Sequence, residues 1–296
     1  MKDLSGRGLA DFVKLYPEGE LAAEACWQLG TRAFEKKEYL AATKMFRKII
    51  LEYPEAQSSK LSLYYLAESL YLAGNNEEAV NAFNNFISSF PEDALRPSSV
   101  FHMANALFKM GRIEEGLRYY NVLTDTNSAS ENDFAPDAAL NRALCFKKLK
   151  RWKDAVNAYE NFIAKYPEHE KKGYAMFQIA EINRNTGNYS EAADYYAKLP
   201  EKCGVSESEA LYRAAQSYQK AGDRENAKRY YVKLLNLEKR DKTFYLTGLV
   251  NLAEIYTGEG LNDEAVGVYK KIMENTDNEE WLAAAEAKIN EIKEKK

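Results

Sequence analysis

Apolar and small residues recur along the chain with a helical spacing. A small residue is followed four positions later by an aromatic residue, and three positions after that by another apolar residue. Offsets of three and four place side chains on one face of an α-helix, so each triplet predicts one amphipathic helix. The leading residues are 37, 37, 39, 37, 35 and 38 positions apart, which indicates a repeated unit. The triplets are Ala42/Phe46/Ile49, Ala79/Phe83/Phe86, Gly116/Tyr120/Leu123, Ala155/Tyr159/Phe162, Ala192/Tyr196/Leu199, Ala227/Tyr231/Leu234 and Ala265/Tyr269/Ile272.

A second series of small residues lies twelve positions before each leading residue. Small side chains allow two helices to approach closely, so each unit is predicted to be a helix pair. The members of this series are Gly30, Ala67, Ala104, Ala143, Ala180, Ala215 and Ala253. Residues typical of a helix end lie between the two series, at Gly74-Asn75, Gly111, Gly187-Asn188, Gly222-Asp223 and Gly260. Aromatic-Pro pairs, which disfavour helical geometry before the proline, end several second helices at Tyr53-Pro54, Phe90-Pro91 and Tyr166-Pro167.

These patterns predict an all-α fold, a right-handed α-solenoid of antiparallel helix pairs with a C-terminal capping helix. Residues 1–17 resemble the second helix of a truncated upstream repeat, so we expect the chain to have been cut from a longer protein. Residues 279–296 are predicted to cap the array, because their apolar residues share one helix face. The seven predicted units between them are 18–54, 55–91, 92–128, 129–167, 168–204, 205–240 and 241–278.

The first unit resembles the tetratricopeptide repeat, although Cys26 stands at the family's Trp position. The matching residues are Leu29-Gly30, Tyr39, Ala42, Phe46 and Pro54. The resemblance covers roughly residues 3–294 and implies a protein-binding scaffold whose first helices line a concave groove. The stretch 16–25 is also similar to repeats of bacterial envelope proteins, such as the Tol-Pal-associated cell-division coordinator and the lipoprotein of the barrel-assembly machinery. That similarity implies a periplasmic or envelope-associated assembly scaffold, with a cytoplasmic location as the alternative.

Composition and charge narrow the possible functions. The net charge is −4 and no Lys/Arg block could neutralise a run of phosphates, so nucleic acid is not expected as a partner. No apolar stretch approaches the roughly 18 residues that a membrane span needs, so no transmembrane segment is expected. The three cysteines have no metal-binding spacing, and we expect two of them to pack as free thiols in helices. With two histidines and no catalytic motif, we expect no enzyme, no metal and no cofactor.

The first helices supply the candidate binding residues. In the first three units they present two rows of aromatic residues, whereas the second row becomes polar and basic in later units. Aromatic side chains offer a large area of contact at a low entropy cost, although repeats of this family also favour them for architectural reasons. The predicted partner-binding groove consists of Trp27, Phe34, Tyr64, Glu68, Tyr71, Phe101, His102, Asn105, Phe108, Phe177, Arg184, Tyr212 and Arg213.

The main hypothesis is therefore a non-catalytic scaffold that binds an extended peptide or a partner protein in this groove. One alternative is a module that stacks cell-wall glycan on the aromatic residues. Another is a helical accessory region of a larger enzyme whose catalytic domain lies upstream. A clamp for the C-terminal carboxylate of chaperones is disfavoured, because no first helix supplies the Lys that opens that motif.

Overall fold

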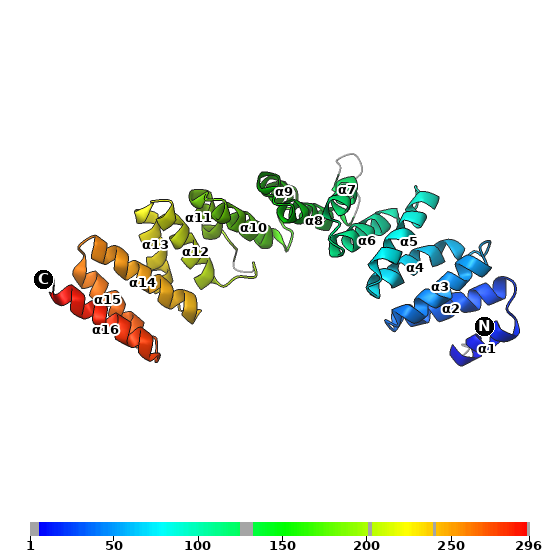
Figure 1. Cartoon of the computed structure of the whole chain (residues 1–296), viewed down its shortest axis with the longest axis horizontal. Helices are drawn as coiled ribbons and strands as arrows, with labels where there is room; N and C mark the ends of the chain where they lie inside the picture. Colours follow the sequence, from blue (N-terminus) through cyan, green and yellow to red (C-terminus); the bar gives the residue numbers. More distant parts are fainter. Residues whose placement is uncertain (1–5, 125–132, 201–202, 239–240, 295–296) are drawn as a thin grey trace. The chain divides into compact units, whose positions relative to one another are not determined.

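The computed structural model describes residues 6–124, 133–200, 203–238 and 241–294, and every regular element in them is an α-helix. Figure 1 shows how the helices follow one another along the chain. The all-α fold class is confirmed for these residues. The helices are α1 Gly6–Leu15, α2 Glu20–Glu35, α3 Tyr39–Glu52, α4 Ser59–Leu72, α5 Asn76–Ser89, α6 Arg96–Lys109, α7 Ile113–Thr124, α8 Ala135–Lys148, α9 Trp152–Lys165, α10 Lys172–Asn185, α11 Tyr189–Ala197, α12 Glu207–Lys220, α13 Arg224–Leu235, α14 Lys242–Gly258, α15 Asn262–Glu274 and α16 Glu279–Glu294.

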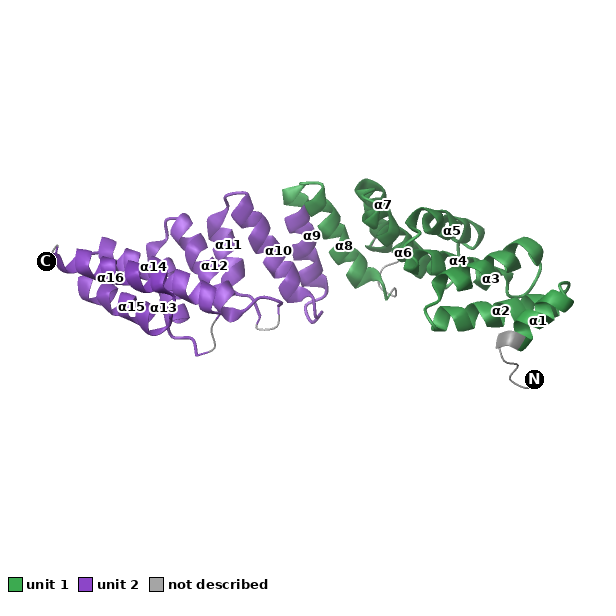
Figure 2. Ribbon diagram, turned by 60° about the horizontal axis from the view of Figure 1, so that its bottom comes forward, with its two compact units in different colours: residues 1–154 green, residues 155–296 purple. Residues whose placement is uncertain are grey.

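The chain divides into two compact units, 1–154 and 155–296, which Figure 2 colours separately. Within unit 1, each helix from α1 to α8 packs against the next one in the chain. The helices from α10 to α16 pack in the same sequential way within unit 2. The boundary between the units falls inside the stretch 129–167 that the sequence suggests as one repeat.

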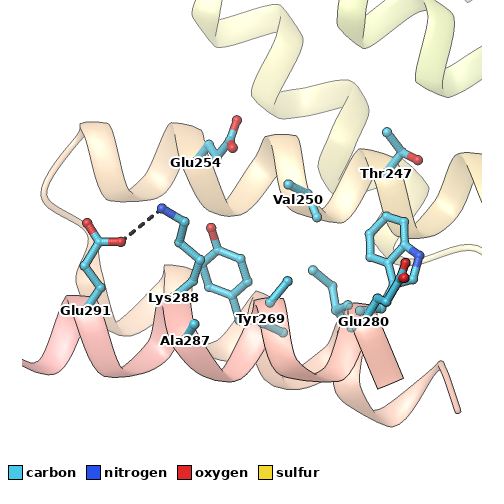
Figure 3. A pocket seen from close by; sticks show the side chains of 12 residues that line it. Thr247, Val250, Glu254, Tyr269, Glu280, Ala287, Lys288 and Glu291 are labelled. Atoms are coloured by element: carbon cyan, nitrogen blue, oxygen red, sulfur yellow. Dashed lines mark hydrogen bonds and ion pairs between the residues drawn. The ribbon is translucent and has the colours of Figure 1, made fainter. Parts of the chain in front are cut away.

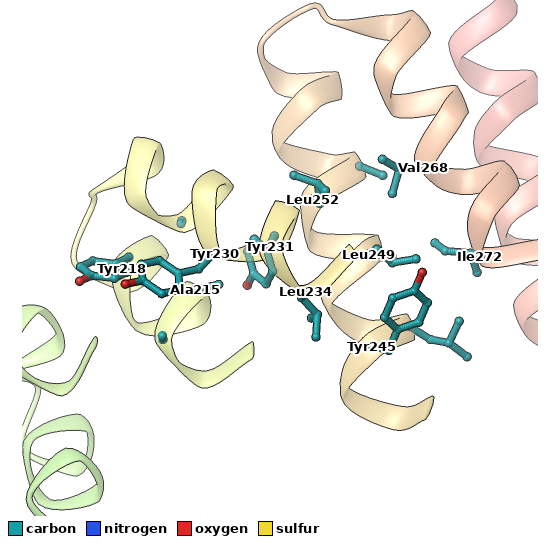
Figure 4. Close-up of a cluster of buried hydrophobic side chains, with 14 of the residues drawn as sticks. Ala215, Tyr218, Tyr230, Tyr231, Leu234, Tyr245, Leu249, Leu252, Val268 and Ile272 are labelled. Carbon is teal, nitrogen blue, oxygen red and sulfur yellow. The ribbon is translucent and has the colours of Figure 1, made fainter. Parts of the chain in front are cut away.

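Both series of small residues lie in the core, as their spacing predicts. Ala67 and Ala79 are fully buried, and the aromatic Phe83 that follows them is also fully buried. The same positions in unit 2 hold Ala215 and Tyr231, which are likewise buried and join one cluster with Leu249 and Ile272 of the following pair. Figure 4 shows the side chains of this cluster. Burial of one apolar face of each helix is therefore the main stabilising contribution in both units.

The turns inside the pairs use the left-handed backbone conformation. Gly74 has a φ of 85°, and its amide and that of Asn75 donate to the last carbonyls of α4. Glycine suits this conformation because a Cβ atom would crowd the following carbonyl. In two pairs the same place is taken by a lysine instead, Lys37 with φ 62° and Lys150 with φ 57°. The sequence pattern of turn glycines therefore misses two of the turns.

The aromatic-Pro pairs end helices as predicted. Helices α3, α5 and α9 end at Glu52, Ser89 and Lys165, directly before Tyr53, Phe90 and Tyr166. The amide of each aromatic residue still donates to the carbonyl four residues earlier, and the backbone then leaves the helix at the proline.

Both ends of the array carry a single helix. Helix α1 packs against α2, and α16 covers α15 with Ala285, Ile289 and Ile292 buried. Residues 1–5 of the segment 1–17 lie outside the described residues. Between unit 1's last two complete helices, Thr124 ends α7 and Ala135 begins α8, and residues 125–132 lie outside the described part of the chain.

Candidate functional site

The candidate site lies on the first helices of the pairs, which are α2, α4, α6 and α8 in unit 1 and α10, α12 and α14 in unit 2. Three contacts link neighbouring first helices in the same register. Each first helix contains one buried small residue of the repeat. The residue directly after it contacts the following first helix, at the position two residues before the small residue of that helix. These contacts, hereafter the cross-helix pairs, are Glu68–His102, Asn105–Asn141 and Glu181–Arg213.

Trp27 and Phe34 are half-buried on α2 and meet at a shared partner on α4. The centre of the Tyr65 ring is 5.5 Å from that of Trp27 and 5.3 Å from that of Phe34, both edge-on. Trp27 also packs against the buried Phe46 at 5.5 Å. Tyr65 is not part of the predicted groove, although it occupies the register of His102 and Arg213 in later pairs.

Tyr64 and Phe101 each contact the first helix of the following pair or the residue directly before it. The Tyr64 hydroxyl lies 2.9 Å from the Ser98 Oγ atom of α6, and burial raises the pKa of this phenol well above its usual range. The Phe101 ring packs 5.2 Å from Phe134, at the start of α8, and 6.2 Å from Tyr120. These two predicted binding residues therefore also form contacts between successive helix pairs.

His102 lies at the centre of a mixed polar and aromatic cluster. Its ring stacks on Tyr71, with 5.4 Å between ring centres and 12° between planes, and its Nδ1 atom meets the Glu68 carboxylate. Glu68 is buried, with 5% of its surface exposed. The Lys109 ammonium lies 4.0 Å from the centre of the Tyr71 ring. The structure thus brings Glu68, Tyr71 and His102 together, and the three side chains hold one another in place.

Asn105 is the residue of unit 1 with the clearest capacity for a partner. Its Oδ1 atom accepts two hydrogen bonds, from the Tyr120 hydroxyl at 2.5 Å and from the Asn141 amide at 3.1 Å. The oxygen is therefore occupied twice, whereas the NH₂ group forms no hydrogen bond with any described residue and remains a donor. Phe108, four residues from Ala104 on the same helix, is half-buried beside it. Asn141 is not part of the predicted groove.

A cluster of charged residues lies on the first helices α10 and α12 of unit 2. The Glu181 carboxylate accepts hydrogen bonds from Arg184 at 3.0 Å, from Arg213 at 2.8 Å and from the Tyr196 hydroxyl. Burial raises the pKa of Glu181, but the hydrogen bonds from Arg184 and Tyr196 and the charge of Arg213 outweigh it, so the pKa is lowered overall. The predicted binding residues Arg184 and Arg213 therefore already form ion pairs with carboxylates of the protein itself.

Phe177 and Tyr212 complete the predicted set in unit 2. The Arg213 guanidinium lies 5.6 Å from the centre of the Phe177 ring. The Tyr212 hydroxyl accepts a hydrogen bond of 2.8 Å from Gln216, and its ring packs 5.6 Å from Phe244. Both rings are half-buried.

A cavity of about 800 Å³ lies between α14, α15 and α16, outside the predicted set. Figure 3 shows its lining. Val250, Ile272 and Trp281 contribute apolar surface, and Glu254 and Lys288 lie toward one end of the cavity. Two sequence signals point to it in retrospect, the Trp on the capping helix and the run of alanines at 283–285 that follows it.

Other chemistry finds little support in the described part of the chain. Residues 6–124, 133–200, 203–238 and 241–294 contain no group of three or more His, Cys, Asp or Glu side chains arranged to hold a metal ion. No helix in these ranges has both the length and the apolarity to cross a membrane. Cys26 and Cys145 are buried free thiols, as expected, and burial raises the pKa of Cys145 to about 12.

Comparison with known proteins places the repeat in a family. Family models described as tetratricopeptide repeat match residues 61–93, 137–169, 174–203, 209–238 and 249–280. These segments together make up more than half of the chain. No curated protein sequence matches the chain significantly.

Two solved structures of similar fold come from bacteria. The C-terminal part of a TPR repeat-containing protein from Cytophaga hutchinsonii matches with a TM-score of 0.61 and 15% identity, over 86% of this chain and 98% of the other. A tetratricopeptide repeat protein from Parabacteroides merdae matches with a TM-score of 0.52 and 16% identity, over 89% of this chain and 96% of the other. These likenesses confirm the α-solenoid of helix pairs as the fold.

Proposed function

Because this chain belongs to the tetratricopeptide repeat family, we propose that it is a non-catalytic scaffold that binds an extended peptide segment of a partner protein. We place the binding surface on the first helices of unit 1, where the predicted aromatic residues lie. The observation that carries this proposal is the amide of Asn105, whose oxygen is occupied by Tyr120 and Asn141 while its NH₂ end is available to donate.

An extended peptide suits this surface for a physical reason. Its backbone carbonyls have no partners of their own, so a fixed amide donor can bind one of them. The half-buried rings of Tyr71, Phe101 and Phe108 then bury further apolar area when the peptide covers them. Because His102 and Phe134 already hold two of these rings, little side-chain entropy remains to be lost on binding.

Unit 1 suits such a partner better than unit 2. The corresponding charged groups of unit 2, Arg184 and Arg213, are neutralised by Glu181 and Glu209 within the protein. A ligand there would have to compete with ion pairs that are already formed. Glycan stacking is less favoured in unit 1, because His102 stacks on the Tyr71 ring and Lys109 also lies against it.

The binding surface can be tested with a library of random 12-residue peptides displayed on phage. We expect peptides selected on the original protein to bind the Asn105→Asp variant at least about tenfold more weakly. The variant loses one hydrogen bond to the peptide, and its carboxylate repels the peptide carbonyl. This substitution keeps the oxygen that accepts from Tyr120 and Asn141 and removes the NH₂ donor. Asn85→Asp, on the exposed surface of α5, makes the same charge change and serves as the matched control. Equal binding to both variants would contradict the proposal.

We also propose that the scaffold acts in assembly of the bacterial envelope, in the periplasm. The support is the form of the repeat around Tyr16-Pro17, which is similar to repeats of envelope proteins. In the cells that produce the protein, we expect external protease to cleave it only after the outer membrane is permeabilised. Protection that persists until the inner membrane is lysed would place it in the cytoplasm instead.

A further inference from the structure

The cavity between α14, α15 and α16 contains a tyrosine hydroxyl that is unpaired within the described part of the chain. Tyr120, Tyr196 and Tyr231 occupy the same position in their second helices, and each hydroxyl donates to a side chain of a first helix. Tyr269 is the equivalent residue of α15 and lines the cavity. Its hydroxyl forms no hydrogen bond with any described residue, and Figure 3 shows it directed into the space between α14 and α16.

The cavity exists because α16 differs from the first helices that precede it. Where those helices carry polar or aromatic side chains, α16 presents Ala284, Ala285 and Ala287 to α14 and α15. These methyl groups are too small to fill the space above Tyr269. The result is a cavity of about 800 Å³, which lies within the range of about 300–1,000 Å³ typical of ligand sites.

The lining combines apolar surface with acidic ends. Val250, Ile272 and Trp281 contribute apolar surface to the lining, and Glu280 lies at one end of the cavity. At the other end the Lys288 ammonium pairs with Glu291 at 3.0 Å, and Glu254 faces them from α14. Three carboxylates thus surround the cavity against one ammonium group. Glu254 forms no ion pair with any described residue, so the site favours a positively charged ligand.

We propose that this cavity binds a short peptide segment of a partner protein that carries a bulky aliphatic side chain next to Lys or Arg. The aliphatic side chain enters the space between Val250, Ile272 and Trp281. The Tyr269 hydroxyl donates to a backbone carbonyl of the segment, and the basic side chain pairs with Glu254. This site belongs to unit 2 and shares no residue with the surface proposed in unit 1, so each can fail without the other.

Trp281 supplies a direct signal for binding. The chain has three tryptophans, so the double substitution Trp27→Phe and Trp152→Phe leaves Trp281 as the single emitter. The probe is an acetylated and amidated peptide of sequence Gly-Lys-Leu-Leu-Lys-Gly. We expect a saturable blue shift of the emission, because the leucine side chains exclude water from the indole. Peptides with Glu in place of Lys, or with Ala in place of Leu, should bind at least about tenfold more weakly.

Substitutions in α16 distinguish binding in the cavity from binding elsewhere on the surface of this helix. Ala284→Phe fills the cavity and should abolish the shift, whereas Ala283→Phe, one residue away on the exposed surface, should leave it unchanged. Tyr269→Phe and Glu254→Gln should each weaken binding by about three- to tenfold. The proposal is overturned if the Lys-Leu peptide causes no shift, if Ala284→Phe binds it as well as Ala283→Phe does, or if the Glu peptide binds equally well. A shift that requires no peptide and grows with protein concentration would also overturn it, in favour of a second copy as the occupant.

Discussion

The two units have the same kind of core and different surfaces. The buried small and aromatic residues of the repeat, such as Ala79 and Phe83 in unit 1 and Ala227 and Tyr231 in unit 2, are called the frame below. In unit 1 the first helices meet through aromatic rings, as Trp27 does with Tyr65 and Tyr71 with His102. In unit 2 the register of Glu68 and His102 holds the ion pair of Glu181 with Arg213. A network of a phenol with amide side chains occurs in both units, around Tyr120 and around Tyr231. Fully buried aromatic residues lie beneath both surfaces at identical places in the repeat.

This difference shows that frame and surface are separable in a repeat fold. The small and aromatic core residues let each helix pair stack on its neighbours, whatever the outward residues are. The outward residues then set the chemistry. Ring contacts depend on area and respond little to salt or pH, whereas carboxylate–guanidinium contacts depend on charge and respond to both. Four substitution experiments test this separation.

The largest effect is expected in the frame and should be equal in the two units. Phe83→Ala in unit 1 and Tyr231→Ala in unit 2 each remove a fully buried ring. We expect each to lower the free energy of unfolding by about 3–5 kcal/mol, measured by urea unfolding followed by circular dichroism. Asn85→Ala on the exposed surface should change it by less than about 0.5 kcal/mol. A small cost in one unit alone would show that the frames differ.

The next effect should be confined to the surface of unit 2. Glu181→Gln removes the charge that Arg184 and Arg213 share, and we expect a loss of about 1.5–3 kcal/mol at pH 7. The pKa of Glu181 is lowered in the folded protein, so its stabilisation is complete above the unfolded value of about 4.3 and is lost as pH falls through the folded value. Thermal unfolding of the variant and the original protein should therefore converge below about pH 4.

A charge that forms no such network is the control for this experiment. The Glu225 side chain is 83% exposed beside Lys228, and Glu225→Gln should change the free energy of unfolding by less than about 0.5 kcal/mol at any of these pH values. If Glu181→Gln were equally silent, the ion pairs of unit 2 would not stabilise its surface.

Two glycines in helices should respond in opposite directions. A Cβ atom at Gly30 would lie 2.8 Å from the Cε1 atom of Phe46, which is fully buried and has no room to move. Gly30→Ala should therefore lower the free energy of unfolding by about 1–2 kcal/mol. This net loss already includes the gain of about 1 kcal/mol from the higher helix propensity of alanine. Nothing lies within 4 Å of a Cβ atom at Gly267, so Gly267→Ala should stabilise by about 0.5–1 kcal/mol. Urea unfolding distinguishes the two signs.

The smallest effect concerns the turns. Lys150 in unit 1 adopts the left-handed conformation that Gly187 adopts in unit 2. This conformation costs a residue with a side chain about 1–2 kcal/mol, and the greater freedom of glycine in the unfolded chain offsets part of that. Lys150→Gly should thus raise the free energy of unfolding by about 0.5–1 kcal/mol, and Gly187→Lys should lower it by a similar amount. If both substitutions changed the free energy of unfolding in the same direction, the two turns would not be equivalent.

The frame was predictable from sequence because its signals are local. Ala67, Ala79 and Phe83 belong to one pair, and offsets of three, four and twelve residues were enough to place them in the core. The turn at Gly74 and the stop at Phe90 follow from the backbone preferences of Gly and Pro alone. The turns at Lys37 and Lys150 escaped notice because neighbouring contacts impose the conformation there against the preference of the residue.

The candidate site was predictable only in outline. The helical register placed Glu68, His102 and Asn105 on first helices, but nothing local indicated that Glu68 meets His102 or that Asn141 occupies the oxygen of Asn105. Such partners are more than thirty residues apart in the chain, so they depend on how one pair stacks on the next. Tyr65 was overlooked for the same reason.

The sequence by itself determined the repeated helix pair, its buried residues and most of its turns, because each depends on contacts within one pair. Only the tertiary structure decided which outward side chains satisfy one another, leaving the amide of Asn105 and the hydroxyl of Tyr269 available. It also decided that the alanines of α16 leave a cavity against α14, since an unfilled volume depends on all the helices around it.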